Sequence, residues 1–262
     1  MLIPFLKMQA QGNDFVIVDY FVPETNALAE TDFPSLAEDV CKPHFGVGAD
    51  GLVLLKPYPI CDAQMIIYNA NGSRAEMCGS ALRCVTWLLH KKTAKKEFRI
   101  LTDSGEKKCR INADKTITVN LGVPEMLKNN YIAEGFTGDL IKIGNPHFII
   151  WKDDLTDEPQ FKYGALIEHH SGFEETVNVH FASLLNKNKI AIKIWEKGCG
   201  ATLACGTGAS ASVFSGIWKG ILDNEVYVTM PGGTVEITAS ESGYLLSGEV
   251  NETFQGKYIW KI

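Results

Sequence analysis

Alternating apolar and polar positions, rich in β-branched and aromatic residues, recur along most of the chain. Such alternation is typical of strands with one buried face, and Gly, Asn, Asp or Pro bounds most of these segments. The chain after Gly232 has the same character and predicts several short strands with Gly or Asn turns between them. The other strands are predicted at residues 15–19, 52–55, 64–68, 116–120, 148–151, 191–195 and 225–229.

Two stretches break this alternation, residues 78–92 and 205–219, and each is apolar around most of its circumference. The pattern predicts two buried helices of about four turns. A third, weaker helix is predicted at residues 35–41. Both long helices start with the same pattern, in which a hydroxyl residue follows Cys-Gly: Cys78-Gly79-Ser80 and Cys205-Gly206-Thr207.

The repeated helix start predicts an internal duplication of a strand-rich unit built around one buried helix. Two such units of about 120 residues would fill the chain, with a boundary near the Gly122-Val123-Pro124 turn. The expected fold class is therefore mixed α/β (α+β), with two similar lobes. Each lobe would be a curved sheet or barrel around its central helix.

The 262-residue chain has an ordinary globular composition, with 45% hydrophobic and 21% charged residues. Its net charge is −6 and its Lys and Arg residues are scattered, which argues against a nucleic-acid partner. We expect no membrane association, because no apolar run reaches the roughly 18 residues that a span needs and no signal-peptide pattern is present. Seven cysteines, an odd number at low density, favour reduced thiols in the cytoplasm over a disulfide framework.

A cysteine in the first turn of a helix lies among unpaired main-chain N–H groups at the positive end of the helix dipole. That position stabilises a thiolate and can lower a thiol pKa from about 8.5 to roughly 3.5–7.5. The small residues that follow each cysteine leave the N–H groups open to an anion such as a carboxylate. Cys78 and Cys205 are therefore the candidate reactive thiols.

Two such helix starts, face to face, would hold one carboxylate and place a sulfur on either side of the attached α-carbon. One sulfur, as a thiolate, would remove the α-proton while the other, as a thiol, supplies a proton to the opposite face. We expect neither a cofactor nor a metal, because no pyridoxal-phosphate lysine pattern is present. The Cys78/Cys84 and Cys199/Cys205 pairs also lack the C-x2–4-C spacing of zinc sites.

Nearly the whole chain resembles the diaminopimelate epimerase family in an ordered series of short motifs. Two of them match the family's active-site motifs: NANG at 69–72 with EMCG at 76–79, and TLACGTGA at 202–209. The others are GNDF at 12–15, FGVGADG at 45–51, GNPH at 144–147, VNV at 177–179, WEKG at 195–198 and PGG at 231–233.

The resemblance implies an active site in the cleft between the lobes. Residues 1–121 and a returning C-terminal strand, at about 253–262, would form the first lobe, and residues 122–252 the second. Family members convert LL-2,6-diaminopimelate to meso-diaminopimelate in lysine and peptidoglycan precursor biosynthesis. Cys78 and Cys205 would then be the acid–base pair of an isomerase, active as a homodimer on a small amino-acid substrate.

The resemblance also assigns substrate-binding residues. The backbone at Gly79, Ser80, Gly206 and Thr207 would hold the reacting carboxylate. The distal amino-acid head would be held by Asn13, Asn69, Asn145, Asn178, Glu196 and Lys197. Glu196 would pair there with the ammonium group. His147 is either a residue of the site or a hydrogen-bonded structural histidine.

Three departures from the family pattern touch substrate-holding positions. Lys197 stands where the family usually has Arg and lacks the bidentate fork that grips a carboxylate. Ser80 stands for the usual Asn, and His180 for a smaller or polar residue. A racemase of another amino acid, with the same fold and mechanism, is therefore the main alternative. A thiol redox protein or a non-catalytic binding module is a further alternative, but neither needs a carboxylate cradle on both helices.

Overall fold

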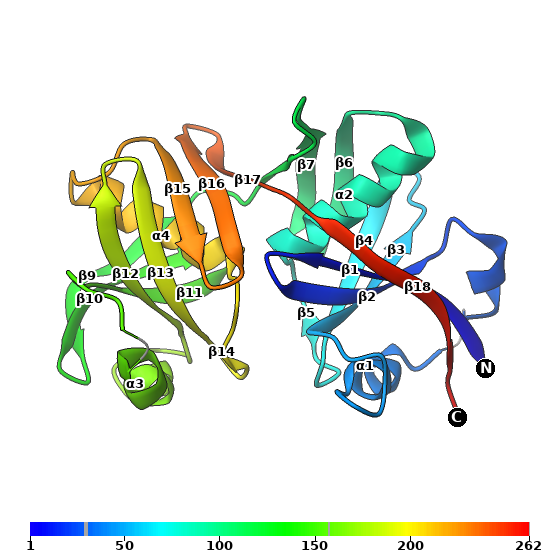
Figure 1. Cartoon of the computed structure of the whole chain (residues 1–262), viewed down its shortest axis with the longest axis horizontal. Helices are drawn as coiled ribbons and strands as arrows, with labels where there is room; N and C mark the ends of the chain where they lie inside the picture. The colour runs from blue at the N-terminus through cyan, green and yellow to red at the C-terminus, as the bar shows by residue number, and fades with distance from the viewer. Residues whose placement is uncertain (29–30, 157, 262) are drawn as a thin grey trace. The chain divides into compact units, whose positions relative to one another are not determined.

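The computed structural model describes residues 1–28, 31–156 and 158–261 (Figure 1). The chain divides into two compact units, Met1–Val119 with Glu249–Ile262, and Asn120–Gly248. Strands predominate in both units, and each holds few helices. The mixed, strand-rich fold class predicted from the sequence is confirmed.

In the first unit the strands follow the order β18-β1-β2-β3-β4-β6-β7-β8, and the short β5 is added beside β4. The β2–β3 and β4–β6 pairs are parallel and the others are antiparallel. The strands are β1 Leu2–Ala10, β2 Asn13–Asp19, β3 Gly51–Lys56, β4 Ala63–Asn69, β5 Arg74–Ala75, β6 Glu97–Thr102, β7 Gly105–Ile111, β8 Ile117–Asn120 and β18 Asn251–Ile259. The helices are η1 Pro23–Leu28, α1 Phe33–Cys41 and α2 Gly79–Thr93.

The second unit repeats this topology, in the order β9-β10-β11-β12-β13-β15-β16-β17 with the short β14 beside β13. Again the third and fifth neighbouring pairs, β11–β12 and β13–β15, are parallel. The strands are β9 Glu125–Ala133, β10 Phe136–Ile143, β11 Asn145–Trp151, β12 Asn178–Asn186, β13 Lys189–Glu196, β14 Gly200–Ala201, β15 Glu225–Met230, β16 Gly233–Ser240 and β17 Gly243–Gly248. The helices are α3 Glu158–Glu168 and α4 Gly206–Trp218.

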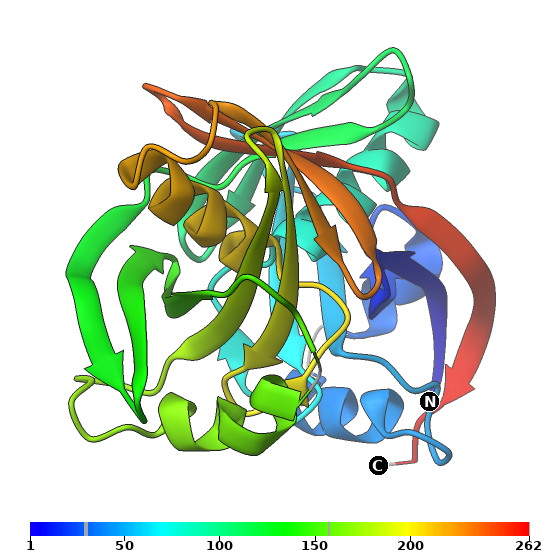
Figure 2. The same cartoon turned by 60° about the vertical axis from the view of Figure 1, so that its left-hand side comes forward.

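Helix α2 packs against the strands of the first unit, and helix α4 packs against those of the second (Figures 1 and 2). Most side chains of α4 are small or apolar, which lets the strands approach it closely. Its end is fixed by Asp139, a fully buried carboxylate on β10 that accepts from Ser215 Oγ at 2.6 Å and pairs with Lys219 at 3.0 Å. The position of the helix start therefore follows from packing along its whole length.

Every predicted strand lies within or overlaps an observed strand, and both long helices are within one residue of their predicted bounds. Helix α3 is not predicted by the sequence pattern. Its Phe161 and Leu166 are exposed while Gln160 is buried, so its apolar residues do not mark its buried face. No helix among the described residues is both long and apolar enough to cross a membrane.

Replacing Gly164 in α3 by Ala is expected to lower the free energy of unfolding by about 1–3 kcal/mol. The new Cβ would lie 2.4 Å from Cδ2 of Trp195, so the indole ring has to move. This cost exceeds the gain in helix propensity, which is at most about 1 kcal/mol. Urea unfolding measures the change, and the exposed Ala165→Ser serves as the control. A Gly164→Ala variant as stable as its control would contradict the close packing of α3 on Trp195.

Candidate active site

The two candidate cysteines occupy the same position in the two units. Cys78 is the N-cap residue of α2, with φ −141° and ψ 121°, and Cys205 is the N-cap of α4, with φ −138° and ψ 105°. Each follows a two-residue strand, β5 or β14. Neither cysteine side chain caps its helix, so the first-turn N–H groups have no side-chain acceptor from the cap.

Asn13 lies beside the Cys78 sulfur, to which its Nδ2 donates at 3.8 Å. This contact places Asn13 at the Cys78 sulfur, whereas the sequence resemblance assigned it to the distal head. Asn13 is held by its neighbour Asp14, whose main chain and carboxylate exchange hydrogen bonds with those of Asp50, at 3.0 and 2.9 Å. These hydrogen bonds join the GNDF motif to the FGVGADG motif.

Arg83 lies in the interior of the unit and contacts residues near Cys78. The sequence analysis did not name it as a site residue. Its buried guanidinium donates to Gln11 Oε1 at 2.7 Å and to Ser80 Oγ at 3.4 Å, and burial lowers the pKa of Arg83 to about 10. Ser80 is almost fully buried and is therefore held in a fixed orientation. Arg83 could have been found from the Cys-Gly-x-x-x-Arg spacing, which places it one helical turn after Gly79.

The Cys205 sulfur has different neighbours. Its sulfur lies beside the carboxylate of Glu196, the N–H of Gly208 and the hydroxyl of Thr207, whose oxygen is 3.7 Å away. Glu196 also accepts from Thr202 Oγ1 at 2.5 Å. Glu196, assigned by resemblance to the distal ammonium, thus contacts the Cys205 sulfur.

Burial, followed by the charge of Glu196, raises the pKa of the Cys205 thiol well above its ordinary value. The sequence argument predicted the opposite direction for a cysteine at a helix start, and for Cys205 that prediction was wrong. The N–H of Gly208 and the Thr207 hydroxyl do lower the pKa, but desolvation outweighs them. Cys205 is therefore a thiol at neutral pH.

Two buried histidines lie close to Cys205. Nδ1 of His147, on β11, is 2.9 Å from Nε2 of His180, on β12, and both side chains are fully buried. One ligand-capable atom from each histidine and the Cys205 sulfur lie within 4.8 Å of one another. Burial lowers the pKa of His147 to about 3, with the main chain of Ile143 opposing the shift, and lowers that of His180 well below 6.5.

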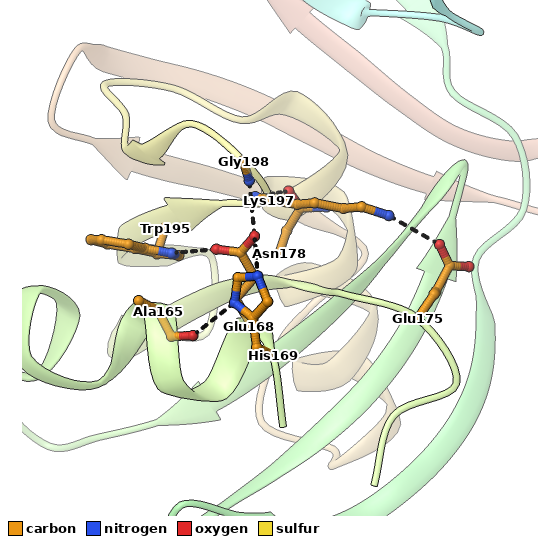
Figure 3. A network of polar contacts seen from close by, with 8 residues as sticks. All are labelled: Ala165, Glu168, His169, Glu175, Asn178, Trp195, Lys197 and Gly198. Carbon is orange, nitrogen blue, oxygen red and sulfur yellow. Dashed lines mark hydrogen bonds and ion pairs between the residues drawn. The ribbon is translucent and has the colours of Figure 1, made fainter. Parts of the chain in front are cut away.

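The turn after Glu196 is fixed by the buried carboxylate of Glu168, at the end of α3 (Figure 3). Its two oxygens accept from the indole N–H of Trp195 and the main-chain N–H of Gly198, both at 2.9 Å. Lys197 points away along the surface, and its Nζ donates to Glu175 at 3.2 Å. No sequence motif indicated Glu168, because it lies on the helix that the pattern did not predict.

The remaining predicted residues lie at strand ends and at the helix start. Asn69 ends β4 and donates to Ser73 Oγ at 2.9 Å. Asn145 begins β11 and is exposed. Asn178 begins β12, donates to the Pro146 carbonyl at 3.2 Å and accepts from the Lys197 N–H at 3.1 Å. At Gly206 an added Cβ would lie 2.9 Å from the Leu246 side chain.

The repeated topology pairs these residues across the two units. Asn13 and Asn145 begin the equivalent strands β2 and β11, and each follows a positive-φ glycine. Asn69 and Glu196 end the equivalent strands β4 and β13. The buried histidines have apolar counterparts: Phe15 stands at the position of His147, and Val53 stands at that of His180.

Solved structures of other proteins share this fold. A hydroxyproline epimerase from Agrobacterium vitis, with bound trans-4-hydroxy-L-proline, matches with a TM-score of 0.75 over 98% of this chain and 90% of its own. A PhzF-family phenazine biosynthesis protein from Bacillus anthracis matches with a TM-score of 0.74 over 99% and 100%. Both are 14% identical to the chain, so they establish a fold shared with amino-acid epimerases.

The chain belongs to the diaminopimelate epimerase family, whose model matches residues 5–127 and 140–252. The diaminopimelate epimerase of Carboxydothermus hydrogenoformans is 38% identical over 97% of this chain and 99% of its own. That of Pelotomaculum thermopropionicum is 36% identical over 98% and 99%. The family predicted from the motifs is confirmed, as is the enzyme class, an isomerase.

Acid is expected to destabilise the protein through His147. The unfolded chain binds a proton to this histidine at about pH 6.5 and the folded chain only at about pH 3, so stability is lost as pH falls below 6.5. Between pH 6.5 and 5 the loss from this residue is about 2 kcal/mol. Urea unfolding at both pH values, with chelator present, should show a loss smaller by that amount in His147→Gln. The exposed His169→Gln should match wild type, and an unchanged pH dependence in His147→Gln would refute the assignment.

Proposed function

We propose that the protein converts LL-2,6-diaminopimelate to meso-diaminopimelate without pyridoxal phosphate, using Cys78 and Cys205 as the acid–base pair. The observation that carries this proposal is the equivalent placement of the two cysteines, each as the N-cap of a buried helix that follows a two-residue strand. Family membership supports the substrate, since the relatives are diaminopimelate epimerases over their full length.

The neighbours of the two sulfurs support complementary protonation states. An amide donor such as Asn13 Nδ2 stabilises the thiolate form of the sulfur it contacts, here Cys78. A carboxylate beside a buried sulfur stabilises the thiol, as Glu196 does at Cys205. We therefore propose that the resting enzyme holds Cys78 as the base and Cys205 as the acid, and that the reverse reaction exchanges the two states.

Proton transfer at Cys205 also needs a route back to the resting state. Glu196 accepts the thiol hydrogen bond and in turn accepts from Thr202, so it can take the proton when Cys205 acts as a thiolate. His147 and His180 stay neutral beside the sulfur and add no charge there. Charge that develops on the substrate carboxylate would be stabilised by main-chain N–H groups at the helix starts, at Gly79, Ser80, Gly206 and Thr207.

The proposal extends to the residues that hold the distal head and to the cellular setting. Asn69, Asn145, Asn178 and Lys197 would hold the distal head of the substrate. A cytoplasmic homodimer that supplies lysine and peptidoglycan precursor synthesis is the cellular setting that the family implies. Cys84 is excluded from the chemistry, because it is fully buried within α2 and burial raises its pKa to about 12.

Incubation with LL-diaminopimelate in deuterated water, with no added metal or pyridoxal phosphate, should yield meso-diaminopimelate with deuterium at the α-carbon. NMR follows both the exchange and the product. The reason is that the proton delivered to the new face comes from a sulfur that exchanges with solvent. Exchange into glutamate or proline, with none into diaminopimelate, would overturn the substrate and favour a racemase of another amino acid.

Cys78→Ala and Cys205→Ala should each lower the rate of epimerisation by at least about 100-fold, since each removes one of the two proton carriers. Initial rates from LL-diaminopimelate and from the meso form measure the loss in both directions. The matched control is Cys84→Ala, which removes a thiol from the interior of α2 and should retain the proton-transfer chemistry. Near-normal turnover in either of the first two variants would remove that sulfur from the mechanism.

Lys197→Arg should lower the KM for diaminopimelate, by up to about 10-fold, if this side chain grips the distal carboxylate, because Arg offers a bidentate fork. The kcat should change little, since the distal head does not react. The exposed Lys189→Arg, at the start of β13, is a control for the substitution itself. An unchanged KM would mean that Lys197 serves its surface ion pair with Glu175, in which both side chains are about half exposed.

A further inference from the structure

The histidine pair beside Cys205 is a property of one unit alone. His147 and His180 are the third residues of β11 and β12, and the third residues of the equivalent strands β2 and β3 are Phe15 and Val53. All four side chains are buried. The same fold around a thiol at the same helix position is therefore stable with apolar residues, so packing does not require two imidazoles there.

The histidines also leave polar atoms unsatisfied. Nε2 of His147 and Nδ1 of His180 are buried without a hydrogen-bond partner in the described part of the chain. A buried polar atom of this kind destabilises the fold and needs an explanation in its surroundings. The His180 ring also packs closely against the start of α4, because an added Cβ at Gly208 would lie 2.1 Å from Cε1 of His180.

A neutral imidazole carries one proton and one lone pair, and the inter-ring hydrogen bond uses one nitrogen of each ring. Whichever ring donates that bond therefore keeps a free lone pair on its unsatisfied nitrogen. The other ring gains a free lone pair when the hydrogen bond breaks. Together with the Cys205 sulfur, within 4.8 Å, these atoms supply two nitrogens and one sulfur.

We propose that His147, His180 and Cys205 bind a thiophilic divalent ion, Zn²⁺ above all, and that the bound ion blocks catalysis by occupying the Cys205 sulfur. Two imidazoles and one thiolate are a known ligand set for Zn²⁺, with the fourth position left to water or to the neighbouring Glu196. On binding, the S–H bond of Cys205 breaks, its proton passes to solvent and an S–Zn bond forms. The metal is an inhibitor here and not a cofactor.

Cobalt titration of the chelator-treated, reduced enzyme tests the ligand set without substrate. Wild type should show the intense visible bands of four-coordinate Co²⁺ and a near-ultraviolet sulfur-to-cobalt band, and Zn²⁺ should displace the cobalt because it binds such sites more tightly. The sulfur band should vanish in Cys205→Ser and persist in Cys78→Ser, which removes the thiol at the equivalent helix position. His180→Gln should weaken binding by at least about 100-fold, whereas the exposed His169→Gln should not.

A wild-type spectrum with only the weak bands of six-coordinate Co²⁺ would overturn the site. Equal loss of the sulfur band in Cys78→Ser, or unchanged affinity in His180→Gln, would overturn the proposed ligands. The blocking effect rests on the proposed function and is measured separately: Zn²⁺ should inhibit epimerisation reversibly, with chelator restoring the rate. Metal binding without inhibition would overturn the block, and an enzyme inactive on diaminopimelate would leave the spectroscopic test intact.

Discussion

The first turn of an α-helix leaves main-chain N–H groups without carbonyl partners, and both units of this chain place Cys-Gly at that turn. The packing of each unit buries this turn and fixes its direction. The strands lie around the helix, its far end is fixed by contacts such as that of Asp139 with Ser215, and the residue before it is extended. A glycine directly after the cysteine places no side chain over these N–H groups.

Burial and the helix terminus act in opposite directions on a thiol at such a turn. At Cys205 desolvation is the larger effect and the Glu196 carboxylate adds to it, while the Gly208 N–H and the Thr207 hydroxyl only partly compensate. The fold alone therefore does not decide the protonation state. The neighbouring side chains differ as well: an amide contacts Cys78 and a carboxylate lies beside Cys205.

Much of the fold was predictable because strand alternation and the two apolar helices report burial directly. Helix α3 was not, because Phe161 and Leu166 are exposed and the pattern is lost. For the site, the sequence identified the cysteines through their position at a helix start. It could not show that Glu196 contacts Cys205, because that contact depends on how the turn between β13 and β14 folds. Nor could it show that His147 meets His180, because that contact depends on the register between β11 and β12. Glu168, which fixes the turn after Glu196, was not predicted because it lies on helix α3.

Duplication explains how one chain presents two equivalent thiols that are not chemically alike. The sequence of parallel and antiparallel pairs, the two-residue strand and the helix cap are repeated, so main-chain geometry is common to both units. The differences lie at single positions within that geometry: Asn69 against Glu196, Phe15 against His147, Val53 against His180. The proposed two-base reaction can use both properties, because like groups can exchange tasks and different neighbours favour one of the two resting positions of the proton. The repeated main-chain geometry makes the positions of the two cysteines alike, and a few different side chains make their surroundings differ.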